Sequence, residues 1–394
     1  MKILIVTTIS NTVNAFLIPH IKFLIEKGNE VEVAFNTVEA VSPKLFELGC
    51  YVHQIKFQRN PLKKENITAY KNIKKVILDG EYDFVHVHTP VAAFLTRLAC
   101  RSIKNITVLY TAHGFHFFKG APKKNWAIYY PIEKIAARWT DGIITINDED
   151  YRAAKKLNIK KCDSVYKVNG VGLDLNKFFP RSPEENAHLR KQYGYDDKAF
   201  ILIYVGELNH NKHQDLLITT VNMLRGKIEN IKLLLVGGGN LLNHYKELVS
   251  RYELEETVHF LGSRDDVHSL MAISDIAVST SRREGLPVSV MEAMATGLPI
   301  IVTNCRGNRD LVTDGENGFV INYDPWECAD AIEKLYHSNE LRQRYGKNSR
   351  TLIKEYALDI VISELEEIYL KHKLINNVNI YADIQTPDNL KKLS

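Results

Sequence analysis

The chain has 394 residues, of which 45% are hydrophobic and 25% are charged. These proportions are typical of a globular protein and exclude a disordered, collagen-like or integral membrane chain. The net charge of +4 hides an asymmetry: residues 1–179 carry 26 Lys and Arg against 16 Asp and Glu, a net +10, and the remaining residues carry a net −6. Two halves of opposite sign, in a chain long enough for more than one domain, indicate two domains with different partners.

The cysteines and apolar runs indicate the compartment. Five widely spaced cysteines without a C-x-x-C pair are typical of a reducing cytoplasm, and they offer no disulfide framework or thiolate zinc site. The apolar run at the N-terminus is too short for a signal peptide, and no window approaches the ~18 apolar residues of a membrane span. We therefore expect a cytoplasmic protein in which any membrane contact is peripheral.

Short apolar runs alternate with amphipathic stretches along the chain. Lys2–Thr7 predicts a strand, Ala15–Glu26 a helix that ends before Gly28, and Glu30–Phe35 a second strand. Further apolar strands are expected at 84–88, 107–111, 142–146, 200–205, 232–236, 276–279 and 299–303. Strands that are apolar throughout and alternate with helices predict parallel sheets covered on both faces.

The expected strands form one set before about residue 175 and another after about residue 200. The polar, proline-containing segment 179–197 between them predicts a linker. We therefore expect an α/β protein with two doubly wound, Rossmann-like domains facing a cleft, over residues 1–178 and 198–357. Ligands bind such sheets beyond the carboxyl ends of the strands, so residues just after each strand are the functional candidates.

One of these segments, EGLPVSVMEAMATGLPIIVT, carries two glutamates. Glu284 precedes a helix that Pro287 opens and Gly297 closes, and Glu292 lies inside it. Free N–H groups near Leu286–Ser289 favour an anion such as phosphate, and carboxylates accept hydrogen bonds from sugar hydroxyls. The pattern favours a nucleotide sugar. By themselves, two such glutamates are more often a solvated loop charge and an exposed helix charge.

The same string resembles the E-x7-E segment of family 4 retaining glycosyltransferases, which have the GT-B fold. Other matching segments are VGELNHNKHQDLL (205–217), LLLVGGGN (233–240), VHFLGSRDDV (258–267), ENGFVI (316–321), HVHTP (86–90), TAHGFH (111–116) and VNGVGLDLNKFFP (168–180). The resemblance covers most of the chain and is strongest to capsule and exopolysaccharide synthesis enzymes. It implies a nucleotide-diphosphate sugar donor, with UDP expected, a glycan or polyprenyl-diphosphate-linked acceptor, retention at the anomeric carbon, and no metal or cofactor. It also implies that a C-terminal helix at about 358–375 crosses back to the N-terminal domain.

The resemblance implies roles for individual residues. Glu284 would contact the donor sugar, Glu292 the ribose, and Lys212 the diphosphate, where negative charge grows in the transition state. His113 would lie near the reacting centre. Further donor contacts would come from Gly206, Gly262, Arg264, Leu286, Pro287 and Val288, of which Gly262 and Arg264 would border the base.

One position departs from the family pattern. The family usually has an arginine where this chain has Glu207, and that arginine shares the diphosphate with the lysine at position 212. A carboxylate cannot bind the diphosphate, so one cation is missing. We expect Arg306 or Arg309 to supply part of this contact, with Glu207 orienting it. The alternatives are that both are ordinary surface arginines, or that activity is weak or lost.

Other classes of function remain open. A nucleotide-sugar 2-epimerase would share the double fold but lack the E-x7-E segment, and a non-catalytic scaffold would be consistent with Glu207. An NAD-dependent oxidoreductase would use the Gly237–Gly239 turn, although Leu242 occupies the place of the third fingerprint glycine. The pairs His86/His88 and His113/His116 suggest zinc, but no Cys or carboxylate completes a ligand set, so we predict no metal.

Two basic stretches in the first half indicate the acceptor side. Pro61–Leu78 predicts an amphipathic helix with five lysines, and Lys119–Trp139 mixes lysines with Trp and Tyr. Such residues favour an anionic membrane surface and a lipid-linked diphosphate. The alternative is that the lysines are solvated and the aromatic side chains are core. No DNA- or RNA-binding motif accompanies the charge, so we expect no nucleic-acid partner.

Overall fold

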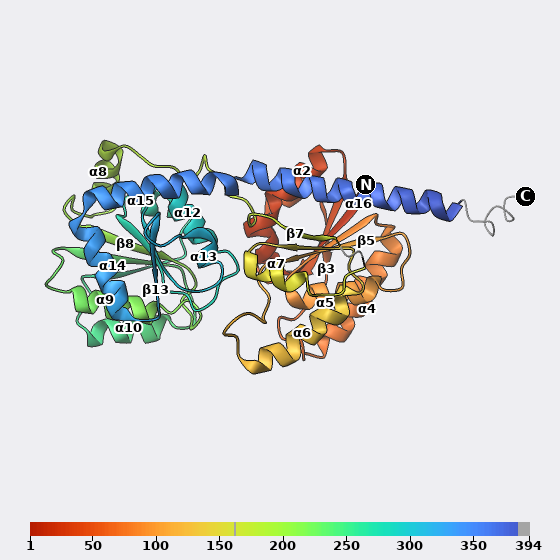
Figure 1. Ribbon diagram of the computed structural model, residues 1–394, viewed down its shortest axis with the longest axis horizontal. Coiled ribbons are helices and arrows are strands. Elements are labelled where there is room, and N and C mark those ends of the chain that lie inside the picture. Colours follow the sequence, from red (N-terminus) through yellow and green to blue (C-terminus); the bar gives the residue numbers. More distant parts are fainter. Residues whose placement is uncertain (161–162, 385–394) are drawn as a thin grey trace, which may run out of the picture. The chain divides into compact units, whose positions relative to one another are not determined.

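The computed structural model describes residues 1–160 and 163–384, with side chains placed as far as residue 375 (Figure 1). Cys162 lies outside the described residues, as does the chain after residue 384. The chain divides into two compact units. Unit 1 comprises Met1–Val171 and the C-terminal segment that begins at Asp359, and unit 2 comprises Gly172–Leu358.

Unit 1 is built around a parallel sheet. Its described residues form seven strands in the order β3-β2-β1-β4-β5-β6-β7. The strands are β1 (Lys2–Ile9), β2 (Glu30–Asn36), β3 (Tyr51–Gln54), β4 (Phe84–His88), β5 (Thr107–Ala112), β6 (Gly142–Thr145) and β7 (Val165–Lys167). The order reverses at β1, which is the arrangement of a doubly wound fold.

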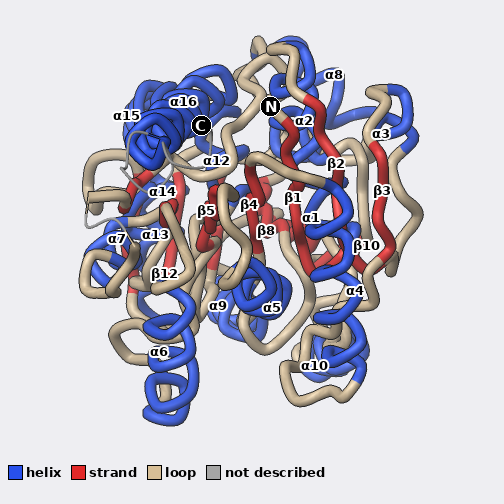
Figure 2. Tube along the Cα trace, turned by 90° about the vertical axis from the view of Figure 1, so that its right-hand side faces the viewer, coloured by secondary structure: helices blue, strands red, loops and turns tan. Residues whose placement is uncertain are grey.

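Helices cover both faces of this sheet. They are α1 (Ser10–Thr12), the π-helical turn η1 (Val13–Leu17), α2 (Ile18–Glu26), α3 (Pro43–Glu47), α4 (Glu65–Gly80), α5 (Pro90–Cys100), α6 (Lys123–Ala137), α7 (Asp148–Ala154) and α16 (Leu358–Ile384). Leu4 and Val85 pack in one hydrophobic core with α4 and α5, while the alternate residues Ile5 and His86 face α2 and α16. Figure 2 shows α5 on one side of β4 and β5, and α2 and α16 on the other.

Unit 2 repeats this plan. Its strands follow the order β10-β9-β8-β11-β12-β13. They are β8 (Phe200–Val205), β9 (Ile231–Val236), β10 (Val258–Gly262), β11 (Ile276–Ser279), β12 (Ile300–Thr303) and β13 (Gly318–Ile321). The helices are α8 (Pro183–Gln192), α9 (Gln214–Leu224), α10 (Leu242–Arg251), α11 (Val267–Ala272), α12 (Val288–Thr296), α13 (Asn308–Leu311), α14 (Pro325–His337), α15 (Asn339–Leu352) and the 3-10 turn η2 (Ile353–Tyr356).

The predicted fold class is confirmed, since both units are doubly wound parallel sheets with helices on their faces. The strands expected at 84–88, 200–205 and 276–279 have these bounds, and the helix expected from residue 61 begins at Glu65. Strands β3, β7, β10 and β13 were not predicted because they are short and partly exposed.

The segment 179–197 is not a plain linker, because it holds α8 and belongs to unit 2. Ser182 and Glu185 form a capping box there: the Ser182 hydroxyl accepts from the Glu185 N–H, and the Glu185 carboxylate accepts from the Ser182 N–H. The units themselves divide after Val171 and after Leu358. In the described part of the chain, no helix is both long enough and apolar enough to span a bilayer.

Candidate functional site

The loops that follow β8 and β11 bring a lysine and a glutamate together in unit 2. Lys212 lies just before α9, and Glu284 lies between β11 and α12. The Lys212 Nζ is 2.6 Å from the Glu284 Oε1, and the two side chains are 21% and 11% exposed. Two residues separated by 72 positions thus form an ion pair at the carboxyl edge of the sheet. Sequence reasoning had singled out both residues.

Buried hydroxyls hold the backbone of Lys212 in place. Its carbonyl accepts hydrogen bonds from the Tyr204 hydroxyl at 2.8 Å and from the Thr280 hydroxyl at 3.1 Å. Its N–H lies 3.0 Å from the Asn209 Oδ1. Asn211 donates from its side-chain amide to the Arg283 carbonyl at 2.9 Å, which ties the two loops together. The lysine therefore projects from a fixed backbone, which suits electrostatic stabilisation of a reacting group.

Arg306 supports the loop that carries Glu284. Its side chain is 4% exposed, and its Nε donates to the Glu284 carbonyl at 3.0 Å. Gly307 follows with a φ of +80°, and a Cβ there would lie 2.6 Å from the Gly285 carbonyl oxygen. Arg306 is therefore not the ordinary surface arginine of the alternative interpretation.

Arg309 is exposed, and its Nη1 donates to the Asn304 side chain at 3.2 Å. Glu207 is also exposed, and its carboxylate makes no ion pair with Arg306 or Arg309 in the described structure. The structure therefore does not support Glu207 as the group that orients either arginine. Whether Arg309 or Arg306 contacts phosphate stays a prediction.

Helix α12 carries the second glutamate. Pro287 is its N-cap rather than its first helical residue, and Gly297 ends it in the left-handed region, with a φ of +80°. Burial raises the pKa of Glu292 to about 7, although Lys177 acts in the opposite direction. Among the described residues, the Glu292 carboxylate has no hydrogen-bond partner. A desolvated carboxylate on the helix after the Glu284 loop is suited to accept hydroxyl hydrogens from a ligand.

Glycines pack the ends of β8, β9 and β10 against one another. The Gly237 N–H donates to the Gly262 carbonyl at 2.8 Å. A Cβ on Gly237 would lie 2.2 Å from the Gly206 carbonyl oxygen, and a Cβ on Gly239 would lie 2.2 Å from the Leu208 carbonyl oxygen. These positions require glycine because backbone meets backbone. The glycine-rich turn thus serves the packing of loops.

Arg264 follows β10 and forms a bidentate ion pair with Asp266, at 2.8 and 2.6 Å. The Arg264 guanidinium and the Tyr193 hydroxyl hold the pKa of Asp266 well below its usual range. The Arg264 side chain is thus engaged with its own loop, and its place beside the base stays a prediction.

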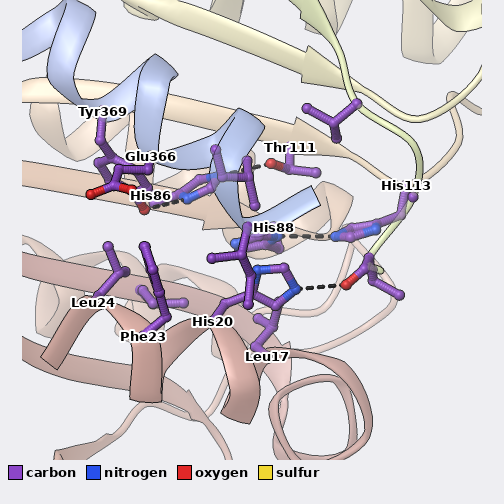
Figure 3. Close-up of a pocket in the computed structure, with 16 residues that line it drawn as sticks. Leu17, His20, Phe23, Leu24, His86, His88, Thr111, His113, Glu366 and Tyr369 are labelled. Atoms are coloured by element: carbon purple, nitrogen blue, oxygen red, sulfur yellow. Dashed lines mark hydrogen bonds between the residues drawn. The ribbon is translucent and has the colours of Figure 1, made fainter. Parts of the chain in front are cut away.

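In unit 1, His113 belongs to a cluster of histidines at the end of the sheet (Figure 3). Its Nε2 shares a hydrogen bond of 3.0 Å with the His88 Nδ1. The His86 ring nitrogens contact the Thr111 hydroxyl and the Tyr369 hydroxyl, both at 2.7 Å. The hydroxyl of Tyr369 comes from α16, and sequence reasoning gave no signal for this contact.

Burial sets the protonation of this cluster. It lowers the pKa of His113 to about 4 and that of His86 to about 3, with further lowering from neighbouring histidines. These rings are therefore neutral near pH 7, and each presents one donor and one acceptor. Within the described chain, no three His, Cys, Asp or Glu side chains are grouped so that they could hold a metal ion.

Comparison with known proteins identifies the family. The family model described as "Glycosyl transferases group 1" matches residues 185–352, and "Glycosyl transferase 4-like" matches residues 2–147. The chain is 40% identical over 371 residues to "Putative glycosyltransferase EpsD" of Bacillus subtilis (strain 168), covering 93% of this chain and 96% of that relative. The chain therefore belongs to the glycosyltransferases of the GT-B fold.

Two further similarities extend this result. The chain is 31% identical over 262 residues to "UDP-Gal:alpha-D-GlcNAc-diphosphoundecaprenol alpha-1,3-galactosyltransferase" of Escherichia coli, covering 66% of each protein. A crystal structure of Anabaena Alr3699/HepE in complex with UDP matches with a TM-score of 0.78 and 21% identity, over 94% of this chain and all of that chain. At that identity the likeness shows the fold.

Proposed function

We propose that this protein is a retaining glycosyltransferase that moves a sugar from a UDP-linked donor to a hydroxyl of a lipid-linked glycan during synthesis of a bacterial surface polysaccharide. The observation that carries the proposal is the Lys212–Glu284 pair at the carboxyl edge of unit 2. The relatives support it. The E. coli relative is named for a UDP-Gal donor and a diphosphoundecaprenol acceptor, and a Staphylococcus aureus relative for capsular polysaccharide biosynthesis.

The donor chemistry follows from unit 2. The Lys212 ammonium neutralises charge on the departing diphosphate, and Glu284 accepts hydrogen bonds from hydroxyls of the donor sugar. The free N–H groups of Leu286 and Val288, at the start of α12, contact a phosphate. Glu292 accepts from the ribose hydroxyls. Arg306 acts through Glu284, since it holds the carbonyl of that residue.

Retention is proposed from the family resemblance. In a front-side path, the bond from the acceptor oxygen to the anomeric carbon forms on the face from which the diphosphate leaves, and the departing phosphate takes the proton of the acceptor hydroxyl. The protein then contributes positioning and charge stabilisation rather than a covalent intermediate. His113, neutral near pH 7 because its pKa is about 4, is proposed to hydrogen-bond the donor sugar without adding charge.

Unit 1 carries the surface proposed to face an anionic membrane from the cytoplasmic side. Leu62 is 90% exposed beside the exposed residues Lys63 and Lys64, and Ile128 on α6 is 51% exposed beyond Lys124. Exposed apolar side chains next to lysines suit the boundary between head groups and acyl chains.

The test is a binding screen followed by a transfer assay. UDP, GDP, their sugar conjugates and NAD are compared by thermal shift, and transfer is then measured to an N-acetylglucosamine diphosphate carried on a short lipid. Lys212→Ala and Glu284→Ala are each expected to lower transfer at least about a hundredfold. Lys246→Ala, which removes an exposed lysine of the same unit, is the matched control and should keep the wild-type rate.

The outcomes separate the rival functions. Near-normal transfer by both site variants would refute the assignment of the site. Stabilisation by NAD alone would favour an oxidoreductase, and conversion of the free nucleotide sugar into its 2-epimer would favour an epimerase. Nucleotide-sugar binding with no turnover of any lipid-linked acceptor would favour the scaffold.

A further inference from the structure

Unit 1 holds a cavity on the opposite face of its sheet from the histidine cluster. The cavity has a volume of about 530 Å³, which falls in the range of small-molecule sites. It opens where β1 and β4 end and is enclosed by α4, α5 and α6 together with the loop before α4. The two basic stretches noted in the sequence, at 61–78 and 119–139, both contribute to its lining.

A buried carboxylate forms part of the wall of this cavity. Glu133 on α6 is 6% exposed, and its Oε2 accepts from the Nη2 of the fully buried Arg97 at 2.9 Å. The Tyr110 hydroxyl is 3.4 Å from the Glu133 Oε1. A carboxylate offers about four lone-pair positions, so two remain for other donors. Among the described residues, the Glu133 carboxylate makes no further hydrogen bond.

The remaining lining combines flat aromatic surfaces with hydroxyls. His116 and Tyr129 stack with ring centroids 4.5 Å apart and an interplanar angle of 29°. Across the lining, the Thr8 and Thr89 hydroxyls are hydrogen-bonded at 2.7 Å. Thr89 has a φ of +64°, a conformation that is unfavourable for a β-branched residue and that the surrounding structure must hold. The lining therefore presents both apolar faces and fixed polar groups.

We propose that this cavity binds a pyranose ring of the acceptor, with two adjacent ring hydroxyls donating to the Glu133 carboxylate and the apolar face of the ring lying against Tyr129. This inference rests on the proposed function, because it names the substrate class that unit 1 receives. A sugar ring has one apolar face and a rim of hydroxyl donors, which matches the lining. An isoprenoid chain would gain nothing from a buried carboxylate and would lose the hydration of the threonine hydroxyls.

The charge at the mouth fits the rest of such an acceptor. Arg59 lines the opening, and the neighbouring Lys63 and Lys64 are exposed. A sugar attached to a diphosphate would place its ring in the cavity and its anionic group among these cations. The ring carries specificity in this arrangement, and the cations contribute attraction that salt weakens.

The experiment fills the cavity by replacing residues of its lining with tryptophan; these are the plugged variants. Ile132 lines the cavity on α6, and Ile135 lies on the same helix but is 48% exposed and outside the lining. Ile132→Trp fills the space, Ile135→Trp is the matched control, and Val91→Trp fills it independently from α5. The probes are methyl glycosides of glucose, galactose, N-acetylglucosamine and N-acetylgalactosamine, with farnesyl diphosphate as the lipid probe. Binding is measured by saturation-transfer NMR, and UDP binding by calorimetry.

At least one glycoside is expected to bind the wild type and the Ile135→Trp control, and to lose at least about tenfold in affinity in both plugged variants. UDP affinity should stay within about twofold throughout, because the plugs lie in the other unit. Glycoside binding that survives both plugs overturns the proposal, as does the absence of any glycoside binding to the wild type. If only farnesyl diphosphate loses affinity in the two plugged variants, the cavity binds an isoprenoid chain instead. If UDP does not bind the wild type, the proposed donor is wrong. The glycoside measurements still decide what the cavity binds, because they do not depend on UDP.

Discussion

Replacing Glu133 by Gln should strongly destabilise unit 1. The substitution removes the anion that faces Arg97, whose guanidinium is fully buried and lies 4.1 Å from the centre of the Tyr110 ring. The Arg97 Nη1 already has no hydrogen-bond partner among the described residues, so no other group takes over its charge. Breaking a buried ion pair by removing one partner costs about 3–5 kcal/mol, because the other charge is left uncompensated.

Urea unfolding followed by tryptophan fluorescence measures this loss. A Trp326→Phe background removes a 71% exposed tryptophan of unit 2 and leaves Trp126 and Trp139 as reporters of unit 1. Glu26→Gln is the matched control, because it neutralises an exposed glutamate that pairs with Lys22 one turn away on α2. An exposed pair of this kind contributes about 0.3–0.5 kcal/mol, so the control should barely shift the midpoint.

A second substitution tests whether the loss of stability comes from the unpaired charge of Arg97. Arg97→Met removes the stranded cation, so the double variant Glu133→Gln with Arg97→Met should regain much of the loss, because replacing both charged partners is often nearly neutral. The reasoning is refuted if Glu133→Gln shifts the free energy of unfolding by less than about 1 kcal/mol, or if the double variant is no more stable than Glu133→Gln alone.

Three further outcomes follow from the structure. Burial lowers the pKa of His86 and His113 below the ordinary value of 6.5, so the unfolded state binds more protons than the folded state. The stability of unit 1 should therefore fall as pH drops from about 6.5 towards 4. Urea midpoints across this range measure the fall, and His113→Asn should make the midpoint depend less on pH. Gly237→Ala should abolish UDP binding, measured by calorimetry, because the added Cβ would strike the Gly206 carbonyl. Gly226→Ala is the control and should retain UDP binding, because a Cβ there would have no other atom within 4 Å. Salt should weaken vesicle binding in a flotation assay more than it weakens UDP binding, since exposed charges are screened; equal loss in both would contradict the proposed surface.

The central strands could be predicted because their burial is uniform. Every residue of β8 except the last is buried, and its sequence is an unbroken apolar run. Every residue of β4 is buried as well, and apolar residues alternate there with His86 and His88. β7 has three residues, none of them buried, and its composition carries no such signal. The helix α8 was missed for a related reason: it buries no residue, and its capping box rather than an apolar face marks its start.

The site could be predicted only in part. The strand-end rule and the two glutamates identified the segment that carries Glu284, but the partner of its carboxylate lies 72 positions away, and the resemblance supplied Lys212. Nothing in the sequence indicates that Arg97 and Glu133 pair, because each lies on a helix and their contact depends on how α5 and α6 pack. The same holds for His86 and Tyr369, which are 283 positions apart.

The bond between His86 and Tyr369 also has a consequence for how the protein is made. Unit 1 is interrupted by the whole of unit 2, so a ribosome must synthesise another 283 residues after His86 before its partner exists. At about 5–20 residues per second, this interval lasts roughly 14–57 s. Once β5, β6 and β7 have been made, the β1–β4–β5 face that α16 covers stays without this helix for the rest of the interval. The nascent chain therefore finishes its second unit before its first, and unit 1 is completed only when α16 has been made and packs onto its sheet.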